Sequence, residues 1–433
     1  MQGVSPKGGT PFSALKNTFG RNPMKKLLTM LLCFVMALSC VFGVAACAPT
    51  DDKGNTGVVT PGGDQPGGDQ PGGTEQPGGD QPGGDEQDPG GEETPEPTPE
   101  PSEGLEFFLV TEDSYMAEYM AELFGQNYAP CYMFIGMGSC SDTEVVIPSE
   151  YNGLAVRMAF LDDLSEPISS LYFPDSIVMI STQEAYIPEL PSLTDIRLPR
   201  NQDTIVSVAW ENCAFYQDPD NWEDGALYMN GWLLATNETL PTDYTVKAGT
   251  YGIAGMAFLD AYYGASTSTG GNINQSNSTG SHVERVTLPD SVKALQAAFM
   301  DCQTLKEVVL PDGILTIGSA AFGYCLGLTE ISIPESVTRI NYYALWGCGN
   351  LTAITIPDSV TIIDDFAFDG CEKLTSIVIP DSVTEVGESA FEYCSSLTTV
   401  YYTGSEAEWE QIEIGSWNDE LLNAEIVFNY KGE

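Results

Sequence analysis

Five cysteines recur every 23 residues in the last third of this 433-residue chain, at Cys302, Cys325, Cys348, Cys371 and Cys394. The residues between them recur too: "IPDSVTIIDDFAFDGCEKLTS" at 356–376 is followed by "IPDSVTEVGESAFEYCSSLTT" at 379–399. A fixed period of this length is typical of solenoids. A single 23-residue unit holds too few apolar side chains to offset the entropy of ordering its backbone, so units must stack to be stable.

Each unit contains two short extended segments and a turn. In "LTEISIP" at 328–334 apolar and polar residues alternate, which predicts a strand with Ile331 and Ile333 facing inward. A second extended segment is expected at 336–340, and a helical turn at 319–325. The predicted fold is a repeat solenoid, mainly β with short helical turns.

The repeat defines the organisation of the C-terminal two thirds. Regular 23-residue repeats occupy 282–404, and degenerate repeats occupy 139–263. Between them, "GASTSTGGNINQSNSTGS" at 264–281 has no apolar pattern and is expected to be a flexible loop. A hairpin is expected at about 210–237, because Asn230-Gly231 favours a tight turn.

Both ends of the repeat region are expected to carry caps. Residues 105–138 form the N-terminal cap, with a helical insertion predicted at 114–130. Residues 405–433 form the C-terminal cap, where Ser405 and Glu408 have capping-box spacing and "AEIVFNY" supplies a last strand. Caps are needed because a terminal coil otherwise exposes an apolar face and an unpaired strand edge.

The N-terminal hundred residues have a different character. From Met24, two lysines precede a short apolar run ending in Val44-Ala45-Ala46-Cys47, so 24–46 is interpreted as an export signal. Its end resembles the lipobox of bacterial lipoproteins, which implies cleavage before Cys47 and lipid attachment to it. An ordinary signal cleaved near Ala46 and a retained membrane helix are the alternatives. Residues 1–23 are an N-terminal extension or a misassigned start.

Residues 47–104 follow with Pro-Gly-Gly-acid repeats and are expected to form a disordered tether. The whole chain carries 62 acidic and 16 basic residues, a formal net charge of −46. Such a surface repels phosphates, so nucleic acid is excluded as a partner, and membrane contact is expected only through the lipid anchor.

The unit I-P-x-S-V-T-x-I-x-x-x-A-F-x-x-C-x-x-L-T-x-I resembles the BspA-like class of leucine-rich repeats of bacterial surface proteins. The segments 138–153, 226–235 and 401–409 are also similar to segments of that family, and the resemblance extends over about 139–433. It implies a solenoid, and it implies a group that includes adhesins binding host or neighbouring-cell surface or matrix proteins. The degenerate N-terminal repeats and the 114–130 insertion depart from the family pattern.

The outward strand positions should line a concave sheet in rows, a surface that solenoids commonly use for binding. A bland solvated surface is the alternative. The candidate contacts are Arg285, Thr287, Glu307, Val309, Glu330, Ser332, Ala353, Thr355, Ser376, Val378, Thr399 and Tyr401.

The hairpin region supplies a second candidate site through its aromatic residues Trp222, Tyr228 and Trp232. They are either the hairpin's own packing or anchors for a protein or a glycan. A calcium loop at 218–225 is disfavoured, because Trp222 stands where an oxygen ligand is needed.

The repeated cysteines are interpreted as a ladder of buried free thiols, with no metal or cofactor. Stacked coils would also place them within disulfide distance, but their number is odd and the adjacent Ala-Phe faces the core. Zinc is disfavoured because no C-x-x-C or histidine partner is present. The sole histidine, His282, gives no nucleophile a base, so no catalytic residue is assigned.

The sequence therefore predicts a bacterial, lipid-anchored cell-surface protein that binds protein or mediates adhesion without catalysis. A carbohydrate-binding or carbohydrate-active surface protein is the alternative.

Overall fold

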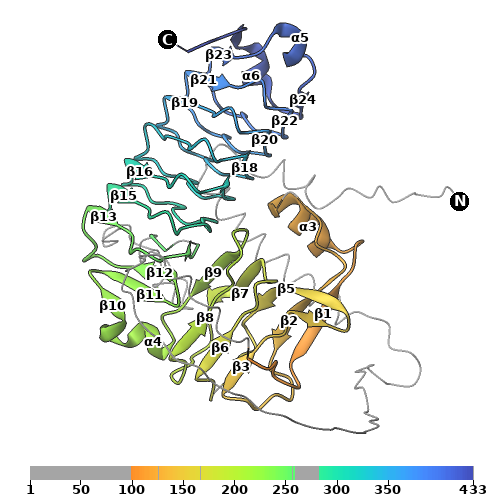
Figure 1. Cartoon of the computed structure of the whole chain (residues 1–433), viewed down its shortest axis with the longest axis vertical. Coiled ribbons are helices and arrows are strands. Elements are labelled where there is room, and N and C mark those ends of the chain that lie inside the picture. The colour runs from red at the N-terminus through yellow and green to blue at the C-terminus, as the bar shows by residue number, and fades with distance from the viewer. Residues whose placement is uncertain (1–98, 125, 166, 256, 259–281, 433) are drawn as a thin grey trace, which may run out of the picture. The chain divides into compact units, whose positions relative to one another are not determined.

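The computed structural model describes residues 99–432 except 125, 166, 256 and 259–281. Within these residues the chain is a β-solenoid with little helix, in which successive coils pair as parallel strands (Figure 1). The expected extension, export signal and nearly all of the tether, residues 1–98, lie outside the described residues, as does the expected loop at 264–281. None of the described helices is long and apolar enough to span a membrane.

In most coils, one strand comes from the segment that ends in the repeated proline. These strands form three sheets along the stack. Their members are β3 (Glu144–Val146), β6 (Ser170–Tyr172) and β8 (Asp195–Arg197); β13 (Asp243–Thr245), β15 (Arg285–Thr287) and β16 (Glu307–Val309); and β19 (Ala353–Thr355), β21 (Ser376–Ile379), β23 (Thr399–Tyr402) and β25 (Glu425–Val427).

The second strand of each coil precedes the Ala-Phe turn. Two sheets contain these strands, and the first of them also includes two strands that pair antiparallel, β1 and β4. Their members are β1 (Glu106–Val110), β2 (Cys131–Gly136), β4 (Glu150–Tyr151), β5 (Leu154–Phe160), β7 (Met179–Tyr186) and β9 (Ile205–Ala209); and β17 (Thr316–Ile317), β18 (Arg339–Ile340), β20 (Ile362–Ile363), β22 (Glu385–Val386) and β24 (Glu413–Ile414).

The Ala-Phe segment is a run of turns, so the expected helical turn at 319–325 is wrong. Its backbone forms a third ladder between coils. The N–H groups of Ala320, Phe322 and Tyr324 donate to the carbonyls of Tyr342, Ala344 and Trp346 at 3.0, 2.9 and 2.7 Å. A helix would direct these groups along its own axis, whereas here every second N–H points to the next coil.

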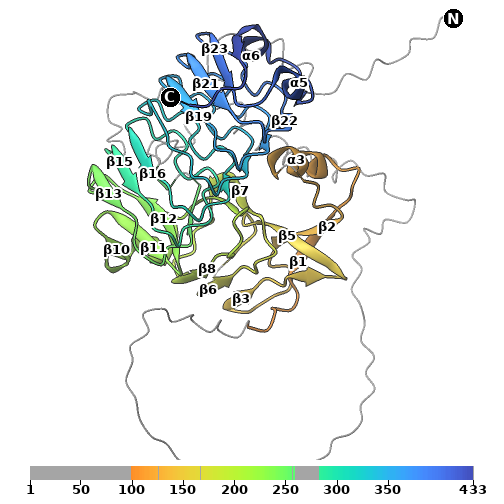
Figure 2. The ribbon, with the colours of Figure 1, turned by 45° about the horizontal axis from the view of Figure 1, so that its top comes forward.

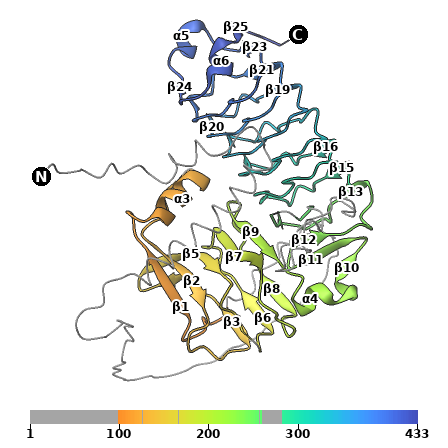
Figure 3. The ribbon, with the colours of Figure 1, turned by 180° about the vertical axis from the view of Figure 1, so that it is seen from behind.

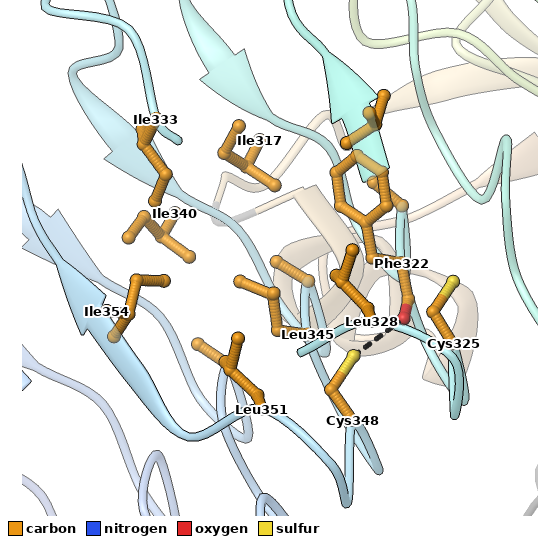
Figure 4. Close-up of a cluster of buried hydrophobic side chains, with 14 of the residues drawn as sticks. Ile317, Phe322, Cys325, Leu328, Ile333, Ile340, Leu345, Cys348, Leu351 and Ile354 are labelled. Atoms are coloured by element: carbon orange, nitrogen blue, oxygen red, sulfur yellow. Dashed lines mark hydrogen bonds between the residues drawn. The ribbon is translucent and has the colours of Figure 1, made fainter. Parts of the chain in front are cut away.

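Side chains at equivalent positions stack into the core, as Figure 4 shows for two adjacent coils. Ile317 pairs in register with Ile340, and Leu328 and Leu351 occupy equivalent positions of the two coils. All four are fully buried. Phenylalanine rings also stack from coil to coil, with Phe299 and Phe322 centroids 5.4 Å apart and nearly parallel. Full burial of one such aliphatic or aromatic side chain contributes about 1.5–3 kcal/mol.

The hairpin around Asn230-Gly231 is present as predicted. It joins β11 (Ala226–Met229) to β12 (Trp232–Thr236), and both turn residues have positive φ, 46° and 83°. The sheet also contains β10 (Trp222–Glu223) and β14 (Gly252–Ile253). Because β12 pairs in parallel with β14, the hairpin is joined to the stack through its second strand. Two short helices precede it, α4 (Ala214–Gln217) and η1 (Pro219–Asn221).

The predicted helical insertion is α3 (Tyr115–Phe124), and it accompanies an unusual sheet face. Met133, Met158 and Met179 pair in register, next to residues that face the core, so they lie on the opposite face. They are nevertheless buried, with at most 1% of their surface exposed. The buried residues of α3 include Met116 and Met120. We infer that the insertion covers an apolar outer face of the first coils.

The segment after α3 lies over the same sheet. The guanidinium of Arg157, from β5, lies 5.2 Å from the ring centre of Tyr128. Both side chains are half-buried. Figures 1 to 3 show α3 beside the ends of β5 and β7 in each view.

The C-terminal cap contains α5 (Glu406–Trp409) and α6 (Asp419–Asn423). The predicted capping box is present, since the Ser405 N–H donates to the Glu408 carboxylate at 2.8 Å. The cap also completes the third ladder with a side chain. The Phe391 N–H donates to Asn418 Oδ1 at 3.0 Å, and Asn418 Nδ2 donates to the Gly387 carbonyl at 2.8 Å.

Replacing Asn418 with alanine removes both of these contacts at a buried position. Buried backbone groups left without a partner cost about 1–3 kcal/mol each. We therefore expect Asn418→Ala to lower the free energy of unfolding by about 2–4 kcal/mol, measured by urea denaturation. Asn423→Ala, at the exposed end of α6, is the matched control and should change it by less than about 0.5 kcal/mol. Equal effects of the two variants would contradict this role of Asn418.

Candidate functional site

Most of the predicted contact residues lie in rows on two sheets of the stack. Arg285 pairs with Glu307, and Thr287 with Val309. Farther along the chain, two rows of three residues each cross β19, β21 and β23. Their members are Ala353, Ser376 and Thr399, and Thr355, Val378 and Tyr401.

The residue between each outward pair is buried, as in Val286 of β15 and Ile377 of β21. The outward residues themselves are exposed or half-exposed. The alternation predicted from sequence is therefore confirmed for these strands. The buried partner fixes the direction of each outward side chain, because successive residues of a strand point to opposite faces.

Glu330 and Ser332 do not belong to a strand, so the strand predicted at 328–334 is wrong. Both are exposed, but the ladder is interrupted between β16 and β19. Leu328 and Ile333 remain buried at 0% and 8% exposure. In this coil the side chains thus pack toward the core without forming a strand. Because the ladder is interrupted here, the predicted binding surface consists of two separate sheets.

Exposed ion pairs cross the first of these sheets. The Arg285 guanidinium lies 3.2 Å from the Glu307 carboxylate, and Lys306 Nζ lies 2.7 Å from that of Glu284. All four side chains are about half exposed. Exposed ion pairs of this kind contribute little to stability. Because the side chains are about half exposed, their charges remain accessible to a partner.

A second outward surface was not identified from the sequence. Thr316, Arg339, Ile362, Glu385 and Glu413 align in register across β17, β18, β20, β22 and β24. The signal was present in segments such as "SVTRI", where buried Val337 and Ile340 flank outward positions.

Arg339 carries the strongest electrostatic contact on this second surface. Its Nε and Nη2 donate to the two carboxylate oxygens of Asp364 at 2.6 and 2.5 Å. The pair is mostly buried, with 28% and 16% of the side chains exposed. The hydrogen bonds to Asp364 raise the pKa of Arg339 above its usual value. Such bidentate geometry fixes the guanidinium plane.

The hairpin aromatics are used mainly in packing. Trp232 is fully buried and has no surface to offer a ligand. The Trp222 indole N–H donates to the Tyr216 carbonyl at 2.9 Å, and its ring packs edge-on against the Tyr216 ring. The hydroxyls of Tyr228 and Tyr244 are 2.6 Å apart. Trp232 therefore cannot contact a ligand, whereas Trp222 and Tyr228 are partly exposed and remain candidate contacts.

The repeated cysteines form the predicted ladder of buried free thiols. Four of the thiols, those of Cys325, Cys348, Cys371 and Cys394, also donate a hydrogen bond to the preceding coil. Cys348 Sγ donates to the Phe322 carbonyl at 3.1 Å, the contact drawn in Figure 4, and Cys325 Sγ donates to the Phe299 carbonyl at 3.1 Å. Burial raises the pKa of Cys348 to about 12.

Cys47 and His282 are the remaining candidate residues. Cys47, the expected lipid-attachment residue, lies outside the described residues. His282 is exposed at the edge of the described chain. Among the described residues, no three His, Cys, Asp or Glu side chains gather closely enough to hold a metal ion.

Comparison with known proteins bears on the regular part of the stack. Residues 293–411 match the BspA type leucine rich repeat region in six copies. These coils are BspA-type leucine-rich repeats. The match is shorter than the resemblance expected over 139–433, because the earlier coils depart from the repeat. A search of curated proteins finds no match.

Solved structures similar to this chain come from several bacteria. A leucine rich cell surface protein of Faecalibacterium prausnitzii A2-165 has 20% identity and a TM-score of 0.32, covering 62% of this chain and 75% of that one. The T. pallidum leucine rich repeat protein has 25% identity and a TM-score of 0.32, covering 43% and 84%. A leucine-rich repeat protein of Bacteroides ovatus ATCC 8483 has 17% identity and a TM-score of 0.29, covering 71% and 77%.

The thiol ladder predicts a distinct pattern of alkylation. In a chain beginning at residue 99, we expect the half-buried Cys140 to react with iodoacetamide at pH 8 while the coil cysteines react only on unfolding. Mass spectrometry of labelled peptides measures this. Denatured, unreduced protein should show eight reactive thiols, the number of free cysteines in the described chain. Fewer than eight would indicate disulfides and contradict the ladder of free thiols.

Proposed function

We propose that this protein is a bacterial cell-surface receptor or adhesin that binds other proteins through its leucine-rich repeats and performs no catalysis. The observation that carries the proposal is the register of outward side chains, which the buried residue between each pair holds in fixed rows. A rigid array of this kind lets many weak contacts act together, since little side-chain and loop entropy is lost on binding.

The mixed chemistry of the rows favours a protein partner. Thr355, Val378 and Tyr401 form a row of one hydroxyl, one aliphatic and one aromatic side chain. The exposed ion pairs lie on the neighbouring sheet. Protein interfaces typically combine an apolar centre having aromatic anchors with a polar rim. The partner expected from the family resemblance is a host or neighbouring-cell surface or matrix protein.

Attachment to the cell surface is the second part of the proposal. It rests on the signal-like segment 24–46 and on Cys47, which would be lipidated, with the acidic residues up to 104 serving as the tether. Lipid chains hold a protein at a membrane by burying methylene groups. The binding surface would then stand away from the cell at the end of the tether.

Binding through the rows can be tested by capture on arrayed matrix and neighbouring-cell proteins, beside a glycan array. We expect the double variant Val378→Glu with Tyr401→Ala to lose about tenfold or more in affinity for a captured protein, because an anchor is lost and a charge is introduced. Asp312→Asn, an exposed change elsewhere, should have no effect. Glycan binding that is lost in Trp222→Ala, with no captured protein, would support the carbohydrate alternative instead.

Anchoring can be tested by fractionating cells that express the full chain. We expect the chain to sediment with membranes and Cys47→Ala to appear in the soluble or secreted fraction, since the variant lacks its acyl chains. Immunoblotting of the fractions measures the distribution. Membrane retention of Cys47→Ala would contradict the lipid anchor and indicate a retained membrane helix at 24–46.

A further inference from the structure

Aromatic residues occupy an unexpected backbone position in the turns of the C-terminal coils. In each of these coils, one residue of the Ala-Phe turn is the first whose N–H donates to the next coil. That residue has a positive φ. Small residues fill this position at Ala297, Ala320 and Ser389, but Tyr343 and Phe366 fill it in the coils between. Trp417 has the equivalent position in the cap. The Ser389 N–H donates to the carbonyl of Ser416, the residue before Trp417, just as the Phe366 N–H donates to that of Glu388, the residue before Ser389.

These aromatics are not required by the left-handed turn. Their φ values are 57° at Tyr343, 58° at Phe366 and 63° at Trp417. This conformation brings Cβ close to the backbone carbonyl and costs about 1–2 kcal/mol for a residue other than glycine. Bulky side chains at such positions call for a functional explanation.

The rings also face outward. Trp417 is 58% exposed, and Tyr393, at the second left-handed position of its turn, is 50% exposed. Tyr343 and Phe366 are half-buried, and their rings stack with centroids 4.8 Å apart and planes 19° from parallel. The C-terminal coils therefore carry aromatic surface along one edge of the stack.

Two carboxylates lie next to the aromatic positions along the chain: Asp365 directly precedes Phe366, and Glu388 directly precedes Ser389. The Glu388 N–H donates to Asp365 Oδ1 at 2.5 Å, which holds the two residues side by side. Burial, followed by repulsion from Asp364, Glu388 and Glu385, raises the pKa of the Asp365 carboxyl. The nearby cation Arg339 is engaged by Asp364. A further positive charge would thus be attracted to this edge.

We propose that the edge strip formed by Tyr343, Phe366, Tyr393, Trp417, Asp365 and Glu388 binds an arginine-bearing segment of a partner protein. A guanidinium stacks on aromatic faces and forms paired hydrogen bonds with a carboxylate, which an ammonium group cannot reproduce. The net charge of −46 would steer such a segment toward the protein. This inference rests on the proposed protein-binding function and adds a second surface to the outward rows.

The test uses the purified full chain and a fluorescein-labelled octapeptide of alternating glycine and arginine, with lysine and citrulline versions as charge controls. Fluorescence anisotropy should show the arginine peptide binding at least about tenfold more tightly than the citrulline peptide and about threefold more tightly than the lysine peptide. Trp417→Gly and Glu388→Gln should each weaken it at least about fivefold. The melting temperature of Trp417→Gly should stay the same or rise, because glycine adopts positive φ without strain.

Two control variants separate the strip from general attraction to an acidic protein. Asp312→Asn and Leu315→Ala change an exposed carboxylate and an exposed apolar residue outside the strip. Neither should alter peptide affinity. Equal weakening by Asp312→Asn and Glu388→Gln, equal affinity for the arginine and lysine peptides, or absence of binding would overturn the proposal.

Binding of an oligosaccharide panel that Trp417→Gly abolishes, without arginine-peptide binding, would also overturn it and identify a glycan strip. None of these outcomes involves Val378 or Tyr401. Failure of the strip therefore remains distinguishable from failure of protein binding through the outward rows.

Discussion

Backbone hydrogen bonding between coils is the constraint on which the structure depends. The extended segments of a solenoid coil cannot pair with each other, and the turns satisfy only part of their peptide groups within the coil. The strands and every second N–H of the Ala-Phe turn therefore pair with neighbouring coils. Each buried peptide group left unpaired would cost about 1–3 kcal/mol. The ladders therefore need a termination at each end. At the first coil, β1 supplies it as an antiparallel strand, and at the last coil Asn418 and Glu420 accept N–H bonds through their side chains.

The same constraint explains the cysteine that marks the period. Phe322 shows the arrangement: its carbonyl accepts the N–H of Cys325 in its own coil and the thiol of Cys348 in the next. Cysteine is small and apolar enough for the core, yet its S–H is a weak donor. From sequence alone the period and the adjacent Ala-Phe could predict burial of the thiol. The hydrogen bond could not be predicted, because it depends on the turn conformation.

The errors of sequence analysis have a common cause. Apolar spacing reports which side chains face the core, and it correctly placed Ile331 and Ile333 inward, although Ile331 is only partly buried. Apolar spacing does not report backbone conformation. It therefore predicted a strand at 328–334, where the structure has none, and a helical turn at 319–325, where the structure has a run of other turns. Nor does apolar spacing show which elements cover the outer face of a strand. The methionines of β2, β5 and β7 look like ordinary core residues until register places them on the outer face.

Because of this arrangement, the residues that determine the fold differ from the residues that are available for binding. The core and the ladders fix the inward side chains and the backbone, while outward positions can hold any residue that tolerates water. Tyr343 and Phe366 go one step further, because they place large side chains at positions of positive φ where Ala320 and Ser389 form the same turn with small ones. A residue that has positive φ and an exposed side chain is a candidate for a contact outside the chain. Candidate binding residues in this protein are therefore those that break the local preference of the coil while leaving its ladder intact.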